Sequence, residues 1–292
     1  MALPQAVLPE HADATRARRS SPDFRWIWRQ FALLAPLALA ATLVWRVAPG
    51  SDSQAYWLTG HSAHLYGAAP GTPGAYLYSP VFATVIWPLT QLSWGVFRLV
   101  WMVAIAAAFA WLLAPLGVRR GVPWFCLCLV EVLMGNIYAF IAVAAVIGIK
   151  HGGAWAFVLL TKITPAVGLL WFAVRREWRS LAISLGVTGG VVALSLALSF
   201  HEWTDWVNYL RAHRGAGGTS WWPARAALGY SLVVAAARWN KAWLLAPAMY
   251  LTQPMMAHWY VGLPLLAAIP RLRTASIQSS TERSAARRAL VH

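Results

Sequence analysis

The chain has 292 residues, of which 59% are apolar and only 11% are charged, whereas a soluble domain carries about 25% charged residues. Its net charge of +15 does not indicate nucleic acid binding, because the arginines cluster between apolar runs and no separate basic domain is present. The composition excludes an ordinary soluble protein and predicts an all-α, polytopic transmembrane fold, since a barrel would show alternating apolar and polar residues.

Polar segments rich in Ser and Arg flank the apolar region at both ends. We interpret residues 1–24 and 271–292 as disordered cytoplasmic tails, and residues 25–270 as one transmembrane domain without a soluble insert. Several stretches without Lys, Arg, Asp or Glu reach the roughly 20 residues that a spanning helix needs. The sequence therefore predicts a multi-pass protein of the plasma membrane, surrounded by lipid.

The first predicted span, residues 28–48, is preceded by arginines, so the positive-inside rule directs it outwards. The loop 49–79 holds no Lys or Arg, and its Gly, Pro and aromatic residues predict a structured external loop. Residues 80–95 are apolar but are bounded and interrupted by proline, which indicates a short helix at the outer surface. The next span, 98–117, returns to the inside.

Short and broken helices are predicted in the middle of the chain. Residues 122–134 and 136–149 are apolar pieces separated at a Gly-Asn pair, and residues 153–165 and 166–174 are separated at Pro165. Each piece is too short to span comfortably. Because broken helices at membrane depth generally line a cavity, we expect these pieces to surround the functional site.

The remaining predicted elements alternate between the two sides of the membrane. They are a span at 180–200, an external loop at 201–223, an apolar helix at 224–237 and a last hairpin made of 242–251 and 254–269. Basic residues that follow the apolar pieces at 175, 238 and 271 place those turns inside.

The charges that fall on the outer side indicate a site for an anionic, lipid-linked ligand. Asp52 lies just past the first span, Lys162 lies within an apolar stretch, and His258 lies at the start of the last helix. Acid, cation and imidazole groups at one water–lipid boundary are typical of such a site. The arginines predicted near the same side, which could contact a phosphate, are Arg46, Arg211 and Arg214.

Each of these three residues also has a structural interpretation. Asp52 could act as a general base on a sugar hydroxyl, or could cap the helix that starts in Ser51-Asp52-Ser53-Gln54. Lys162, whose insertion costs about 2.5–3.5 kcal/mol, could clamp a phosphate or could snorkel at a helix end. His258 could shuttle a proton or bind phosphate, or could be an interfacial residue. The sequence shows neither a metal-ligand cluster nor a nucleotide-binding fingerprint, so we expect no metal and no cofactor.

Several motifs occur in an order that resembles a known family. They are an Asp with an aromatic past the first span, a Leu-Tyr-Gly element, a proline-led helix start, a Lys-x-Thr-Pro element before a basic cluster, and a late histidine. Here they are Asp52 with Tyr56, Leu65-Tyr66-Gly67, Tyr78-Ser79-Pro80, Lys162-Ile163-Thr164-Pro165 with Arg175-Arg176-Glu177-Trp178-Arg179, and His258. Together they resemble glycosyltransferase family 87, membrane enzymes of the GT-C type. The family's Gly-Gln-x-Asn element differs here and reads Gly135-Asn136-Ile137-Tyr138.

The resemblance implies a hexosyltransferase that takes a sugar, generally mannose and in some members arabinofuranose, from a polyprenyl phosphate. The acceptor would be a glycolipid or glycan on the outer face, as in lipoglycan synthesis for the cell envelope. Asp52 would be the catalytic base. The residues implied to bind the substrate or its phosphate are Lys162, His258, Arg46, Arg211, Arg214, Tyr56, Asn136 and Tyr78.

Two functions of other classes also fit a membrane protein with these charges. A transporter or flippase of lipid-linked sugars would need access from both sides and, in most such folds, a core built from repeats. We find no internal repeat in the sequence. A non-catalytic partner subunit of a glycan-assembly complex would tolerate the replacement of both Asp52 and Lys162.

Overall fold

The computed structural model describes residues 24–163, 166–214, 220–254, 260 and 262–275, and within these ranges every regular element is a helix. Two helices in the described part are long and apolar enough to cross a membrane, Trp94–Leu116 and Trp178–Ala212. A bent pair, Val118–Met134 with Tyr138–Gly148, supplies a third candidate span. The chain is an all-helical membrane protein, as predicted.

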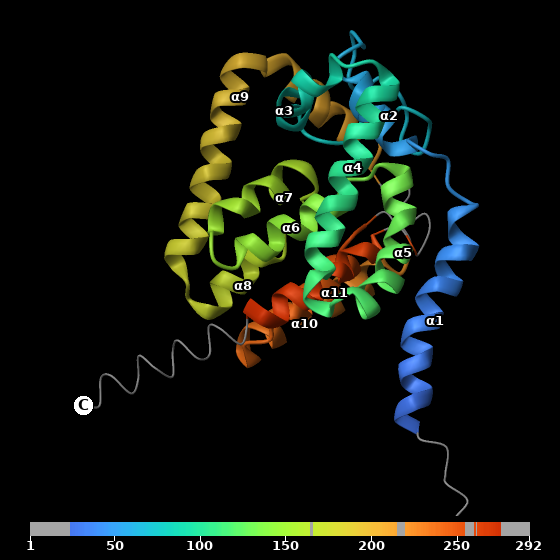
Figure 1. Ribbon diagram of the computed structural model, residues 1–292. Helices are drawn as coiled ribbons and strands as arrows, with labels where there is room; N and C mark the ends of the chain where they lie inside the picture. The colour runs from blue at the N-terminus through green and yellow to red at the C-terminus, as the bar shows by residue number, and fades with distance from the viewer. Residues whose placement is uncertain (1–23, 164–165, 215–219, 255–259, 261, 276–292) are drawn as a thin grey trace, which may run out of the picture.

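The long helices form the outside of the molecule. α1 (Phe24–Val44) packs along α5 (Val118–Met134), and α4 (Trp94–Leu113) packs against α5 and α6 (Tyr138–Gly148). α9 (Trp178–Ala212) stands on the side of the molecule opposite α1, as Figure 1 shows. Many apolar side chains of α4 and α9 are exposed on the protein surface, which is the arrangement that lipid-facing helices require.

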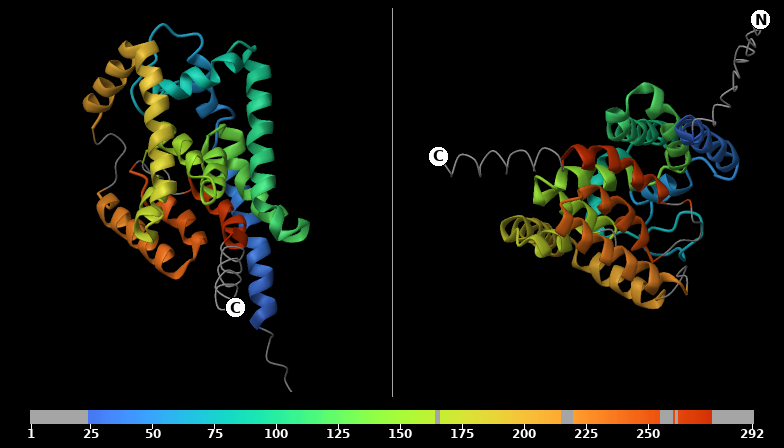
Figure 2. Two further views of the ribbon diagram at one scale, coloured as in Figure 1. Left: turned by 90° about the vertical axis from the view of Figure 1, so that its left-hand side faces the viewer. Right: turned by 90° about the horizontal axis from the view of Figure 1, so that it is seen from below.

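The buried core lies between these outer helices. It is built from α4 and α6 together with three elements of the second half of the chain, α8 (Gly168–Arg175), α10 (Trp222–Trp239) and α11 (Leu245–Leu251). Alanines are frequent in this core, and their small side chains allow the helix backbones to approach closely. Figure 2 (left) shows α6 between α4 and α9.

The predicted breaks in the middle of the chain are confirmed. α5 and α6 meet at an angle of 119° across the residues between Met134 and Tyr138. α7 (Trp155–Thr161) and α8 are likewise separate helices, and the short helix predicted after the first loop is α3 (Pro80–Thr90). Pro80 occupies the first turn of α3, where its missing N–H has no helical partner to lose.

The external loop predicted over 201–223 is wrong in its first half, because α9 continues to Ala212. At Ser199 (φ −147°, ψ 53°) the backbone is not helical, so α9 consists of two helices joined at a kink. This kink lies at the end of the apolar run predicted as a span over 180–200, although no Gly or Pro occurs between residues 191 and 214. The change in hydropathy therefore coincides with the end of one helix, and a second helix, in place of the predicted loop, follows it to Ala212.

Two other predicted boundaries also differ. The first span was placed at 28–48, whereas α1 ends at Val44. An apolar helix was predicted over 254–269, but its described part contains a 3₁₀ helix, Leu263–Ala268, followed by α-helical residues to 275. Gly262, with a left-handed φ of 83°, is the N-cap of this 3₁₀ helix, and a proline occupies its first turn.

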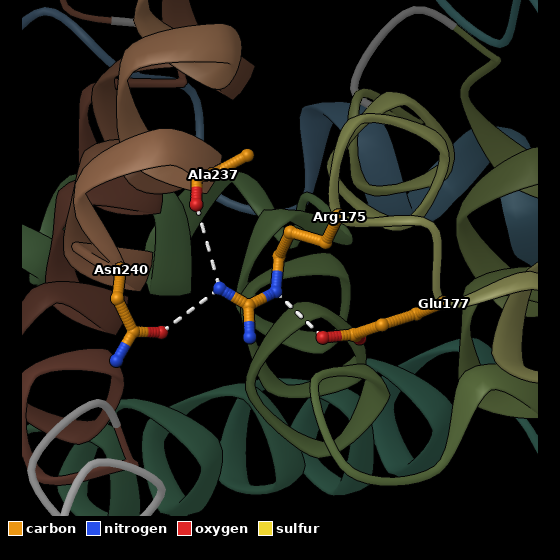
Figure 3. Close-up of polar contacts among 4 residues, drawn as sticks. All are labelled: Arg175, Glu177, Ala237 and Asn240. Atoms are coloured by element: carbon orange, nitrogen blue, oxygen red, sulfur yellow. Dashed lines mark hydrogen bonds and ion pairs between the residues drawn. The ribbon is translucent and has the colours of Figure 1, made fainter.

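Arg175 links α8 to α10, at the end of the molecule opposite α2 (Ser51–Leu58) (Figures 1 and 3). Its Nε donates to Glu177 Oε1 at 2.6 Å, and its Nη1 donates to Asn240 Oδ1 at 3.0 Å and to the Ala237 carbonyl at 3.4 Å. The guanidinium carbon also lies 4.8 Å from the centroid of the Trp171 ring. Part of the basic cluster that follows α8 is therefore structural.

We expect Arg175→Met to lower the free energy of unfolding by about 1–2 kcal/mol, because charged hydrogen bonds are lost while Glu177 remains partly exposed to water. Thermal unfolding of the detergent-solubilised protein would show this as a lower Tm. Arg179→Met removes an exposed arginine from α9 and should leave Tm unchanged. Equal Tm values for the two variants would contradict the structural role of Arg175.

Candidate functional site

Asp52 lies in the first turn of α2, and α2 is fixed against the break between α5 and α6. The N–H of Gly50 donates to the Leu133 carbonyl, at the end of α5, at 2.7 Å. Further along α2, Trp57 Nε1 donates at 2.9 Å to the carbonyl of Leu92, which lies between α3 and α4. The N-cap of α2 is Gly50, so the alternative interpretation of Asp52 as the capping residue is wrong. The carboxylate instead turns toward Asn136, beyond the end of α5.

A chain of polar contacts joins Asp52 to Lys162. Asn136 Nδ2 donates to Asp52 Oδ2 at 2.5 Å, and Lys162 Nζ donates to Asn136 Oδ1 at 3.4 Å. Lys162 follows the last residue of α7 in an extended conformation. Ser79 Oγ donates to the Leu160 carbonyl and so fixes the end of α7 against the start of α3. Three segments far apart in sequence thus place one acid, one amide and one cation together.

Aromatic rings surround the Lys162 ammonium group. Its Nζ lies 3.6 Å from the centroid of the Tyr138 ring and 5.7 Å from that of Tyr78. Tyr78 and Tyr56 share a hydrogen bond of 2.9 Å between their hydroxyls, and both rings are buried. Ring faces attract a cation without neutralising it, so the lysine is stabilised while its charge stays available to a ligand.

The surroundings of Asp52 change its acidity. Burial raises the pKa of the Asp52 carboxyl above its usual range, and the positive charge of Lys162 and the hydrogen bond from Asn136 oppose part of that rise. A carboxylate with a raised pKa is a stronger proton acceptor. Burial also raises the pKa of the Tyr78 phenol, which therefore stays protonated at neutral pH. The site combines a basic carboxylate with a neighbouring cation.

The structure brings together some of the predicted site residues and not others. Asp52, Asn136, Lys162, Tyr56 and Tyr78 form one cluster. The three predicted arginines have exposed side chains outside this buried cluster, on the turn after α1 and at the end of α9: Arg46, Arg211 and Arg214. The histidine predicted to take part, His258, lies outside the described residues. Among the described residues, no group of three or more His, Cys, Asp and Glu is placed to hold a metal ion.

Three residues near the cluster were not among the predicted site residues: Tyr138, Gln253 and Glu131. Tyr138 packs on Lys162, and its hydroxyl donates to Gln253 Oε1. Glu131 is fully buried in α5; its Oε1 accepts from the Gly262 N–H at 3.2 Å, and its Oε2 is buried without a hydrogen bond in the described structure. The insertion cost that pointed to Lys162 applies equally to an acid in an apolar helix, so it could have identified Glu131.

Gly135 permits α2 to approach the break. Its φ of 77° is left-handed, and a Cβ at this position would lie 2.5 Å from Ser53 Cβ and Oγ. We expect Gly135→Ala to destabilise the protein by about 1–3 kcal/mol and to reduce activity, because α2 and Asp52 must shift. Activity and Tm of the purified variant would show both effects. Gly186→Ala, in α9 with no atom within 4 Å, is the matched control. Wild-type activity of Gly135→Ala would show that α2 need not approach so closely.

Comparison with known proteins gives one match. A protein-family model described as glycosyltransferase family 87 matches residues 76–291, which is most of the chain. The matched stretch includes Tyr78, Asn136 and Lys162 and begins after Asp52 and Tyr56. No curated protein and no solved structure matches this sequence.

Proposed function

Since this chain belongs to glycosyltransferase family 87, a family of membrane enzymes, we propose that it transfers mannose from a polyprenyl-phosphate donor to a glycolipid or glycan acceptor. We further propose that the site faces the outer side of the plasma membrane. One observation carries the proposal: the contact chain that runs from Asp52 through Asn136 to Lys162.

The proposed reaction is an inverting transfer. As the acceptor oxygen attacks the anomeric carbon of the donor sugar, Asp52 takes the proton of the acceptor hydroxyl. The bond between the anomeric carbon and the phosphate oxygen breaks, and its electron pair leaves with the lipid phosphate. Lys162 stabilises the negative charge that grows on this phosphate. The donor's phosphate ester supplies the driving force, so no nucleotide is needed.

The geometry supports these roles because the acid and the cation are separated by one side-chain amide. Asp52 and Lys162 both contact Asn136, at 2.5 and 3.4 Å, so both can approach one sugar unit and the phosphate attached to it. Their attachment to α2 and to the end of α7 holds them at this separation before the substrate binds. Such preorganisation favours the transition state over the ground state.

The direct test is transfer by the purified protein in lipid nanodiscs. Labelled polyprenyl-phosphate-mannose and a glycolipid acceptor should give a mannosylated product without any nucleotide sugar. A flippase would instead move the labelled donor across liposome membranes without forming product. A partner subunit would show no transfer alone, and the transfer that it supports in whole membranes would survive replacement of both Asp52 and Lys162.

The pH dependence of transfer should report the environment of Asp52. The base must be ionised, so kcat/KM should fall as the pH falls through the Asp52 pKa, and burial places this acid limb above the ordinary range of aspartate. Asn136→Leu removes a hydrogen bond that lowers this pKa, so the limb should move to still higher pH. Gln91→Leu, which replaces an exposed carboxamide beyond α3, should show the wild-type profile. An acid limb at the same pH in Asn136→Leu would exclude Asp52 as the titrating base.

A further inference from the structure

A cavity of about 310 Å³ lies beside α2, next to the face that carries Asp52. Two of its lining residues, Ala55 and Thr59, are three and seven positions after Asp52. Residues at these spacings share one face of a helix. The volume is at the lower end of small-molecule pockets, ~300–1,000 Å³. The cavity therefore has room for a small ligand on the side of α2 where the proposed base lies.

The far wall of this cavity is held in place by the rest of the protein. The wall is formed by the segment between residues 64 and 76. Tyr209 Oη, on α9, donates to the Ala68 carbonyl at 2.9 Å, and Trp206 Nε1 donates to the Leu77 carbonyl at 3.3 Å. Tyr76 Oη donates to the Ser79 carbonyl at 2.9 Å. These bonds fix the wall from outside the cavity, so binding of a ligand there would cost little ordering.

The chemistry of the lining selects an uncharged ligand with hydroxyl groups. None of the residues that line the cavity is Asp, Glu, Lys or Arg, so the cavity offers a phosphate no permanently charged partner; its one imidazole is that of His64. Thr59 Oγ1 donates to the Tyr56 carbonyl at 2.7 Å and Ser62 Oγ donates to the His64 carbonyl at 2.9 Å. Each hydroxyl has thereby used its proton, and Ser62 Oγ also accepts from the His64 N–H at 3.3 Å, so both hydroxyls offer a ligand only their remaining acceptor capacity. The other walls include apolar side chains: Leu58, Leu65 and Pro73.

These features match a sugar ring. A sugar ring has hydroxyl donors at its rim and apolar C–H groups on its faces. An acyl chain has no donor that could form a hydrogen bond to the hydroxyl oxygens of Thr59 and Ser62. With a rise of 1.5 Å per residue, Ala55 lies about 4.5 Å and Thr59 about 10 Å from Asp52 along the helix. A sugar ring in the cavity thus lies about one sugar unit away from the Asp52 carboxylate.

We propose that this cavity binds an uncharged sugar ring of the acceptor, adjacent to the sugar whose hydroxyl faces Asp52. The inference rests on the proposed function in one respect, namely that the acceptor reacts at Asp52. It adds that the enzyme recognises at least two sugar units of its acceptor, and that the second unit determines acceptor affinity without taking part in the chemistry.

The test introduces a large side chain at a residue of the cavity wall, so that the side chain takes up the space of the ligand. Gly67 lines the cavity, and its φ lies outside the left-handed region. A Cβ at this position would meet only atoms of His64, at 3.9 and 4.0 Å, so the backbone can accept the side chain of Gly67→Phe without a clash at Cβ. We expect this variant to raise the KM for octyl dimannoside at least tenfold, while the KM for the polyprenyl-phosphate donor and the KM for octyl monomannoside stay unchanged. Ala69→Phe, at an exposed residue that does not line the cavity, is the matched control and should behave as wild type.

Other outcomes would overturn the proposal. These are an unchanged KM for octyl dimannoside, an equal rise for both acceptors, or a rise in the donor KM alone. If the wild-type protein transfers no sugar, the proposed function fails and binding still tests the cavity. Saturation-transfer NMR should then detect octyl dimannoside on the wild-type protein and on Ala69→Phe but not on Gly67→Phe, and equal signals from all three would refute the cavity as a sugar site.

Discussion

Asp52→Asn should reduce the rate of sugar transfer by roughly 10²–10⁴-fold, the range that a positioned general base contributes. An amide cannot take the proton of the acceptor hydroxyl at neutral pH. The substitution keeps the shape of the side chain, and the oxygen of the new carboxamide can still accept the hydrogen bond that Asn136 donates to the present carboxylate. We therefore expect the loss in kcat and no change in Tm. Transfer from labelled polyprenyl-phosphate-mannose in nanodiscs measures the rate.

A matched control separates this effect from a general loss of negative charge. Asp205→Asn makes the same chemical change on α9, where Asp205 is partly exposed and its Oδ2 lies 3.8 Å from His201 Nε2. This variant should transfer sugar at the wild-type rate. If Asp52→Asn and Asp205→Asn have equal activity, Asp52 is not the base.

Lys162→Met should lower kcat by roughly 10²–10³-fold, the loss that follows removal of one group stabilising a developing negative charge. Methionine has an unbranched side chain that can occupy the space beside the Tyr138 and Tyr78 rings, so the charge is removed while the packing is kept. The charge on the leaving phosphate grows as the bond breaks, and the loss should therefore appear mainly in kcat and less in the donor KM. Single-turnover kinetics with bound donor measure this step.

Lys241→Met is the control for this second substitution. Lys241 is an exposed lysine in the turn between α10 and α11, distant in sequence from the cluster, and its replacement should leave kcat unchanged. A lysine that only snorkels at a helix end contributes nothing to kcat. Wild-type kcat in Lys162→Met would therefore favour the snorkelling interpretation over the phosphate clamp.

The sequence predicted those parts of the fold that depend on local composition. Runs without charge identified the span at Trp94–Leu116, and Gly and Pro identified the breaks after α5 and α7. The end of the apolar run near residue 200 coincides with the kink at Ser199, but the helix that follows to Ala212 was missed, because the prediction took a polar segment to be a loop. A helix satisfies its backbone hydrogen bonds internally whatever its side chains, so a polar segment after an apolar one can also be helical.

The candidate site could be predicted only in part. Lys162 was identified from the cost of a charge in an apolar stretch, and Asp52 from its position and from the family resemblance. The charge rule gives the side of the membrane on which a residue lies but gives no distances, so it grouped the exposed arginines with the buried cluster. The packing of Tyr138 on Lys162 depends on the 119° bend between α5 and α6, which no local pattern specifies.

Asn136 determines how far apart the two charges of the proposed site are held. Its carboxamide keeps the carboxylate and the ammonium group apart, whereas in direct contact they would largely cancel each other's field. The resting protein therefore holds a fixed separation of negative and positive charge. In the proposed reaction a proton moves toward the negative end while an anion forms near the positive end. The protein's own dipole is thus aligned in advance with the dipole that the reaction creates, so few groups must reorient at the moment of transfer.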